Sequence, residues 1–121
     1  MALYESGQMY LETIYVLSQR LNRVRAIDVG EELGFSKPSV SRALGILKRG
    51  GYVESDETGS LSLTDAGLEV AQMIYARHEV LTKLLVKLGV DAETASEDAC
   101  RMEHVISHES FEAMRRFAEE N

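Results

Sequence analysis

The stretch that decides the fold is residues 26–49, AIDVGEELGFSKPSVSRALGILKR. Its first eight residues suit a short helix, and Gly34-Phe35 suits a tight turn. Ser36 suits the N-cap of a second helix, which carries Pro38 in its first turn and runs to the end of the stretch. Two helices joined by so short a turn are typical of a helix-turn-helix, and we predict that motif here.

The second helix of this motif has an apolar face and a basic face. Val40, Leu44 and Leu47 recur at i, i+4 and i+7 and are expected to pack inward. The stretch from Ser36 to Arg49 holds four basic residues and no acidic one. Small and cationic residues near the start of a recognition helix meet base edges and phosphates in the major groove of DNA. The candidate DNA-binding residues are therefore Ser36, Lys37, Pro38, Ser39, Ser41, Arg42 and Arg49.

Charge is distributed unevenly along the chain. The net charge of −7 by itself opposes binding to a polyanion. Residues 1–64 carry seven basic and eight acidic groups, however, whereas residues 65–121 carry six basic and twelve acidic groups. Because the first half is nearly neutral, its basic helix is a plausible phosphate-facing surface.

Two short strands are expected after the basic helix. A glycine pair ends the helix, Tyr52-Val53 and residues 61–63 are typical of strands, and a polar turn around Gly59 joins them. Such a hairpin is the wing of a winged helix-turn-helix, here preceded by an amphipathic helix over Tyr4 to Leu21. Short helix pairs also occur in bundles that never touch DNA, but the hairpin and the basic helix favour a DNA-binding domain over residues 1–64.

The second half is expected to be entirely helical. Thr64 can cap a long helix from Asp65 to about Leu88, and further helices are expected from about Ala92 to Ile106 and from Glu109 to Phe117. A single monomeric core is one interpretation. Proteins with a helix-turn-helix usually need two copies to reach two half-sites, so we favour a symmetric homodimer through a dimerisation domain over residues 65–121.

Three potential metal ligands converge in this second domain. Cys100, Glu103 and His104 stand at i, i+3 and i+4, so a thiolate, a carboxylate and an imidazole share one helix face beside the apolar stripe. Three ligands leave a position that another donor must fill. His78 is a candidate, although a lone histidine at apolar spacing is more often a hydrogen-bonded core residue, and His108 lies at a helix boundary and is left out. We therefore predict that the second domain also binds metal.

Composition limits the possible roles of the single cysteine, the cellular compartment and the class of activity. The single cysteine cannot form an internal disulfide, so Cys100 is buried filler, a reactive thiol or a metal ligand, and its neighbours favour the last. No targeting signal begins the chain and no segment reaches the ~18 apolar residues of a membrane span, which indicates a cytoplasmic protein. A metal enzyme would need an acid–base group beyond the ligands, and we find none, so no enzyme is expected. A thiol redox regulator acting through Cys100 is the alternative.

Four strings of the chain resemble the diphtheria toxin repressor family of iron- and manganese-dependent regulators. They are QMYLETIY (8–15), RHE (77–79), LGV (88–90) and above all DACRMEHV (98–105). The resemblance runs from about Tyr4 to Phe117. It implies a metal-activated dimeric repressor of metal-uptake or homeostasis genes, in a two-domain form that lacks the SH3-like domain of many iron-type relatives.

The resemblance also implies a ligand set. Met9 lies about 150° from the centre of the apolar stripe of its helix. By resemblance it corresponds to the methionine that joins Cys100, Glu103 and His104 in the iron-type primary site. A thioether and a thiolate favour iron(II), or cobalt(II), nickel(II) and zinc(II) in vitro, over manganese(II), which prefers oxygen donors. Iron(II) is therefore the expected ion.

Other positions resemble the manganese branch. Glu12 matches a ligand of that branch, whose members carry aspartate and glutamate where this chain has Met9 and Cys100. His78 matches an ancillary-site histidine of the iron branch, but Thr82 and Ser96 stand where that branch has glutamate and histidine. Glu12 and His78 therefore keep manganese(II) as the alternative ion, in the same site or in a second site that shares ligands.

Overall fold

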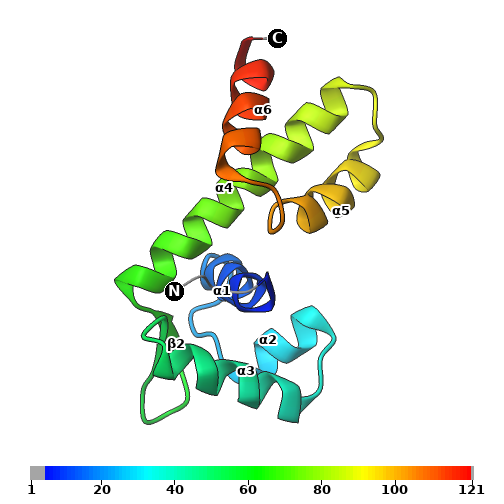
Figure 1. The fold of residues 1–121 in the computed structure, drawn as a ribbon. Helices are drawn as coiled ribbons and strands as arrows, with labels where there is room; N and C mark the ends of the chain where they lie inside the picture. Colours follow the sequence, from blue (N-terminus) through cyan, green and yellow to red (C-terminus); the bar gives the residue numbers. More distant parts are fainter. Residues whose placement is uncertain (1–4, 121) are drawn as a thin grey trace. The chain divides into compact units, whose positions relative to one another are not determined.

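The structure is a computed structural model that describes residues 5–120 of the 121-residue chain (Figure 1). The chain forms two compact units: the first ends at Gln72 and the second begins at Met73. The predicted helical fold with a two-stranded wing is confirmed. In chain order, the elements are α1 (Glu5–Ser18), α2 (Ala26–Leu33), α3 (Lys37–Arg49), β1 (Val53–Ser55), β2 (Leu61–Leu63), α4 (Asp65–Lys87), α5 (Ala92–Met102) and α6 (His108–Glu120).

The helix-turn-helix of α2 and α3 is encoded locally. Gly34 follows α2 in the left-handed conformation, φ 73°, and its N–H donates to the carbonyl of Gly30. At the start of α3 the Ser36 hydroxyl accepts the N–H of Ser39 at 3.4 Å. Pro38 lies in the first turn, where the helix needs no main-chain donor. The predicted turn at Gly34, the Ser36 N-cap and the place of Pro38 are therefore confirmed.

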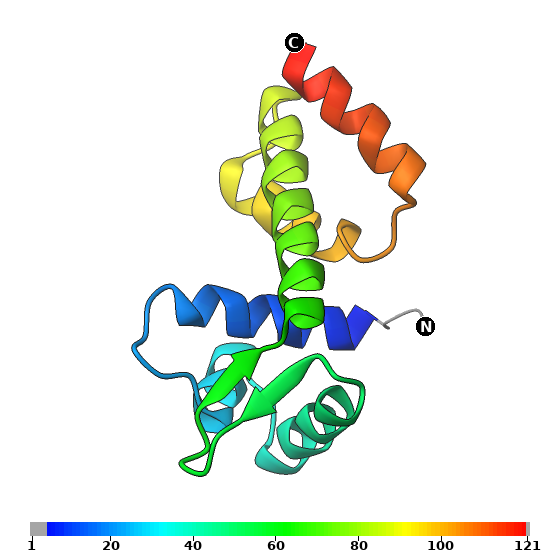
Figure 2. The same ribbon diagram turned by 90° about the vertical axis from the view of Figure 1, so that its left-hand side faces the viewer.

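The wing is a minimal antiparallel hairpin. β1 and β2 pair with Val53 opposite Leu63, and Figure 2 shows them as two short arrows that precede α4. The N–H of Leu61 donates to the carbonyl of Val24 at 2.7 Å. The hairpin is therefore hydrogen-bonded to the loop between α1 and α2 as well as to itself.

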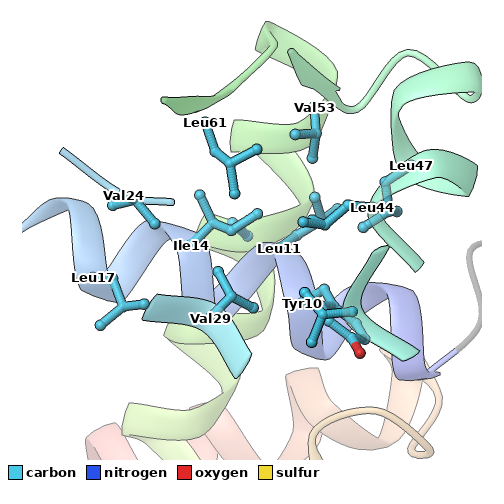
Figure 3. Packing of buried hydrophobic residues seen from close by; sticks show 12 residues of the cluster. Tyr10, Leu11, Ile14, Leu17, Val24, Val29, Leu44, Leu47, Val53 and Leu61 are labelled. Carbon is cyan, nitrogen blue, oxygen red and sulfur yellow. The ribbon is translucent and has the colours of Figure 1, made fainter. Parts of the chain in front are cut away.

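One cluster of apolar side chains holds the first unit together (Figure 3). α1 and α3 supply its largest share, from the apolar faces that their spacing predicts. The first part of α4 also contributes, so the cluster extends past the hairpin. Its buried members are Tyr10, Leu11, Ile14, Leu17, Val24, Val29, Val40, Leu44, Leu47, Val53, Leu61 and Ala71.

α1 is shorter than predicted. It ends at Ser18, whereas the apolar spacing predicted a helix to Leu21, which is 41 % exposed. The N–H groups of Gln19 and Arg20 donate to carbonyls three residues back, at 3.1 and 3.0 Å, and this tighter winding ends the helix. The predicted start at Tyr4 lies outside the described residues.

α4 is the longest helix, with 23 residues. As predicted, Thr64 caps it: the hydroxyl oxygen accepts the N–H of Gly67 at 3.1 Å. Among residues 5–120, no helix has both the length and the apolar character needed to cross a membrane. In the second unit Ile74 and Leu81 of α4 are completely buried, as are Ala95 and Ala99 of α5.

α5 ends at Met102, four residues before its predicted end. Cys100 is on the helix, but Glu103 is the C-cap and His104 lies in the following turn. The prediction that all three share one helix face is therefore wrong for His104. The local reason is a tighter turn, in which the N–H of Val105 donates to the carbonyl of Met102 at 3.1 Å.

Candidate metal centre and nucleic-acid interface

Glu103 is the centre of a polar network in the second unit. Its side chain is completely buried, and Oε2 lies 2.9 Å from Nδ1 of His78 on α4. Because a carboxylate only accepts hydrogen bonds, Nδ1 carries the donated proton. In the neutral imidazole Nε2 then accepts, and it lies 3.3 Å from the hydroxyl of Ser96 on α5. Ser96, His78 and Glu103 therefore form one hydrogen-bonded chain.

The other carboxylate oxygen of Glu103, Oε1, has no hydrogen-bond donor among the described residues. Oε1 is buried and receives no hydrogen bond from the described residues, although Nε2 of His104 lies 3.3 Å away. A buried carboxylate oxygen without a donor is costly, because nothing replaces its hydration. A carboxylate beside an imidazole is a donor set that divalent metal ions accept. The residues of this site therefore fit a metal ion.

Cys100 lies at the edge of this region. It is exposed on α5, and it lines a hollow of about 670 Å³ together with His78, Glu93, Ser96, Glu97 and Arg101. The thiol is therefore accessible to a soluble ion or reagent, and it shares the hollow with one of the two imidazoles.

The candidate DNA-binding residues lie on α3 in the first unit. Lys37, Pro38, Ser41, Arg42 and Arg49 are exposed, and Ser39 is partly buried. The hydroxyl oxygen of Ser36 already accepts a hydrogen bond as the N-cap of α3. A contact of Ser36 with DNA would therefore add to that bond. With no acidic residue on α3, the helix presents a cationic surface.

A largely apolar hollow of about 770 Å³ lies between α2 and α3. Ile27 and Phe35 lie in its wall, and Lys37 and Lys48 line it as well. Lys48 is one of the four basic residues between Ser36 and Arg49, but the sequence analysis did not include it among the candidate DNA-binding residues. Lys48 therefore lies on the same hollow as Lys37, near the other end of α3.

Comparison with known proteins covers both units. The family described as "Iron dependent repressor, N-terminal DNA binding domain" matches residues 2–61, and "Iron dependent repressor, metal binding and dimerisation domain" matches residues 64–120. The chain belongs to the iron-dependent repressor family. The family that the sequence strings indicated is thereby confirmed.

Several named relatives of this family member are regulators. An uncharacterized HTH-type transcriptional regulator of Methanocaldococcus jannaschii is 34% identical, over 95% of this chain and 94% of that protein. The transcriptional regulator MntR of Escherichia coli O157:H7 is 34% identical over 93% of this chain and 72% of that protein. The diphtheria toxin repressor of Corynebacterium diphtheriae is 32% identical over 88% of this chain and 48% of that protein.

Solved structures give the same result for the fold of the repressor. The manganese regulator SloR superposes with a TM-score of 0.83 at 26% identity, over all of this chain and 56% of that chain. A manganese-dependent transcriptional repressor in complex with manganese superposes with a TM-score of 0.86 at 25% identity, over 93% of this chain and 52% of that chain. This chain therefore spans about half the length of these two solved relatives.

The predicted ligands of the repressor fall in both units. Within the second unit the structure brings together Glu103, His104 and His78, and Cys100 shares a hollow with His78. Met9 and Glu12 are partly buried on α1, in the first unit. Their part in a metal site stays a prediction.

Sequence reasoning missed two polar residues beside the candidate metal centre. Arg77 donates to the main chain of Glu103, and Ser96 contacts His78. The signal for Arg77 was present: it stands between Ile74 and Leu81 at the spacing of the buried face of α4, where a charged residue is unusual. The signal for Ser96 was only the resemblance, which places it where the iron branch has a histidine, and the spacing of the helix gave none.

Proposed function

We propose that this chain represses transcription as a homodimer whose affinity for operator DNA rises when a divalent metal ion binds at Glu103. The observation that supports the proposal is the completely buried Glu103 carboxylate, of which one oxygen contacts His78 and the other receives no hydrogen bond from the described residues. A bound cation would supply the positive charge that this oxygen lacks. We place this activity in the cytoplasm.

The proposed ligands are Cys100, Glu103 and His104 together with Met9, and the proposed ion is iron(II). The thioether and the thiolate are the reason, since soft sulfur donors disfavour manganese(II). Because Met9 belongs to the DNA-binding domain and the others to the second domain, metal occupancy is coupled to DNA affinity. Coupling of ~1 to 3 kcal/mol corresponds to roughly 5- to 150-fold tighter binding.

Manganese(II) is the second candidate ion. Glu12 supplies an oxygen donor of the kind that manganese(II) prefers, and His78 adds an imidazole nitrogen. Two solved relatives are named as manganese-responsive regulators. In this alternative the sensing role moves from Met9 and Cys100 toward Glu12 and His78.

The proposed DNA contacts are made by α3, with Arg42 and Arg49 on its exposed side. A dimer would place two such helices at successive half-sites one turn of DNA apart. The second unit leaves large apolar side chains exposed, among them Leu88 at 65%, Val105 at 62% and Phe117 at 52%. Exposed apolar surface of this kind favours self-association, which sedimentation equilibrium measures directly.

The test is an anaerobic titration of the metal-free protein with iron(II) and, separately, manganese(II). Binding to a duplex selected from a random-sequence pool is followed at fixed salt, and ions per subunit are counted. Activation by iron(II) with one ion supports the sulfur-containing site. An equal or better response to manganese(II) with two ions supports Glu12 and His78 as the sensing ligands. No response to either ion would refute metal activation.

A matched pair of variants tests the position of the site. Glu103→Gln keeps the shape of the side chain but removes its charge, so metal-dependent DNA binding should be lost while the fold is retained. Glu79→Gln makes the same change at an exposed position on α4 and should behave as the unmodified protein. If DNA affinity of the Glu103→Gln variant still rises with metal, Glu103 is not a principal ligand.

A further inference from the structure

Arg77 is a buried arginine in the second unit, with 8% of its surface exposed. Its Nη1 donates to two main-chain carbonyls, those of Glu103 and Ile106, both at 3.1 Å. The guanidinium carbon also lies 5.3 Å from the centre of the Phe111 ring. This one side chain therefore ties α4 to the turn after α5 and to α6.

An arginine is a costly choice at this position. Among residues 5–120 Arg77 forms no ion pair, and its Nε is buried without a hydrogen-bond acceptor. Removing a charged group from water costs several kcal/mol unless its partners compensate, and an apolar residue often packs at lower cost. What an apolar residue cannot do is donate to the two carbonyls of the turn.

These carbonyls belong to the segment that carries two of the proposed ligands. Helix ends leave carbonyls without main-chain partners, and α5 ends here, at Met102 with Glu103 as its C-cap. Arg77 holds the main chain of Glu103, and the next residue, His78, holds the carboxylate of Glu103 at 2.9 Å. Consecutive residues of α4 therefore hold Glu103 at its backbone and at its side chain.

We propose that Arg77 is a positioning residue of the metal centre. Its guanidinium fixes the turn of residues 103–106, so that the Glu103 carboxylate and the His104 imidazole stay directed toward one ion. This role rests on the proposed function, because it presupposes a metal site at Glu103. Outer groups that orient ligands typically change metal affinity by about 10- to 100-fold.

The test compares Arg77→Met, Arg77→Lys and the control Arg116→Met, which changes an exposed arginine of α6. Cobalt(II) is the probe ion, because its visible absorption reports both occupancy and coordination geometry. The dissociation constant is measured at a temperature where each metal-free variant is folded by circular dichroism. Under that condition a general loss of stability leaves the constant unchanged, because the competent state is fully populated.

We expect Arg77→Met to weaken cobalt(II) binding by about 10- to 100-fold and to shift the absorption bands. Arg77→Lys should recover part of the loss, since an ammonium group can donate but lacks the planar fork. Arg116→Met should match the unmodified protein. If Arg77→Met does not fold, Arg77→Lys decides, and it should bind more weakly than the unmodified protein.

Two results separate the possible failures. An unmodified protein that binds neither cobalt(II) nor manganese(II) overturns the proposed function, and the role of Arg77 with it. An unmodified protein that binds cobalt(II), beside folded Arg77 variants with the same constant and the same spectrum, overturns only the role of Arg77.

Discussion

Gly67 is a glycine whose surroundings leave no room for a side chain. A Cβ built there would lie 2.1 Å from the carbonyl oxygen of Tyr52. Because that atom is main chain, Gly67→Ala must displace the first turn of α4 from the hairpin. We expect the free energy of unfolding to fall by about 1 to 3 kcal/mol or more, measured by urea denaturation.

Gly45→Ala is the matched control. In the middle of α3, a Cβ at Gly45 would meet only the flexible end of Arg49, at an ordinary 3.5 Å. Alanine is the better helix former, so this variant should be more stable by about 1 kcal/mol. Equal effects of the two substitutions would show that close packing at Gly67 does not decide its identity.

The proposed DNA interface can be tested by substituting Arg42. Arg42→Ala should weaken DNA binding by about 1 to 3 kcal/mol and reduce its dependence on salt, with metal affinity unchanged. Arg20→Ala removes an arginine that is exposed and paired with Glu32, and it should leave DNA affinity alone. Unchanged DNA affinity of the Arg42→Ala variant at low salt would contradict the assignment of α3 as the recognition helix.

At the residue scale, sequence spacing identified Glu103, His104 and Cys100 as a group but not their geometry. The expected common helix face requires α5 to continue through His104. The helix ends earlier, where the buried side chain of Arg77 takes the carbonyl of Glu103. That contact joins residues 26 positions apart, and local periodicity carries no information about it.

At the scale of elements, the turn of the wing depends on one carboxylate. Asp56 Oδ1 accepts hydrogen bonds from the hydroxyl of Thr58 at 2.7 Å and from the N–H groups of Ser60 and Thr58 at 3.0 and 2.9 Å. These bonds, that from the Thr58 hydroxyl foremost, lower the pKa of Asp56 below its ordinary 3.8, and the charge of Arg23 adds to the effect.

The sign of this shift predicts a pH dependence. A carboxyl group with a lowered pKa in the folded state stabilises the wing above its ordinary pKa, and that contribution is lost as the pH falls through the folded-state value. The stability advantage of the unmodified protein over Asp56→Asn should therefore shrink in acid. Thermal unfolding at neutral pH and below pH 3.8 measures it. A difference that stays constant between the two conditions would contradict the role of the charge.

Elements with strong local signals were predictable, and the C-terminal ends of α1 and α5 were not. The helix-turn-helix was read correctly because Gly34, Ser36 and Pro38 act within a few residues of themselves. The end of α1 was placed too late because Leu21 fits the apolar spacing, yet the chain has already left the helix at Ser18. A periodic pattern describes which residues suit a helix, and it does not say where the chain winds into a tighter turn and the helix ends.

At the scale of the whole molecule, the division of the chain can be tested by truncation. The sequence predicted a boundary after Thr64, whereas the first compact unit ends at Gln72. Ala71 is completely buried in the core of that unit, and Val70 packs against it. A fragment that ends at Gln72 should therefore unfold cooperatively and be more stable than one that ends at Thr64, by about 2 kcal/mol or more.

Urea unfolding of both fragments decides between the boundaries. Fragments of equal stability would favour the boundary that the sequence predicted. The sequence could not place Ala71 in the first core, because α4 runs without interruption from Asp65 to Lys87. Nothing in a continuous helix marks the point at which its contacts pass from one unit to the other.

The single exposed cysteine gives the whole molecule one chemical handle. A thiol-specific alkylating reagent added to the native protein can modify only Cys100, so each subunit gains one mass increment. If this thiol is a ligand, alkylation and metal occupancy exclude each other. The fraction of subunits that stay unmodified, measured by mass spectrometry, would then report the fraction of occupied sites. This measurement works inside a mixture of proteins and needs neither DNA nor a spectroscopic probe.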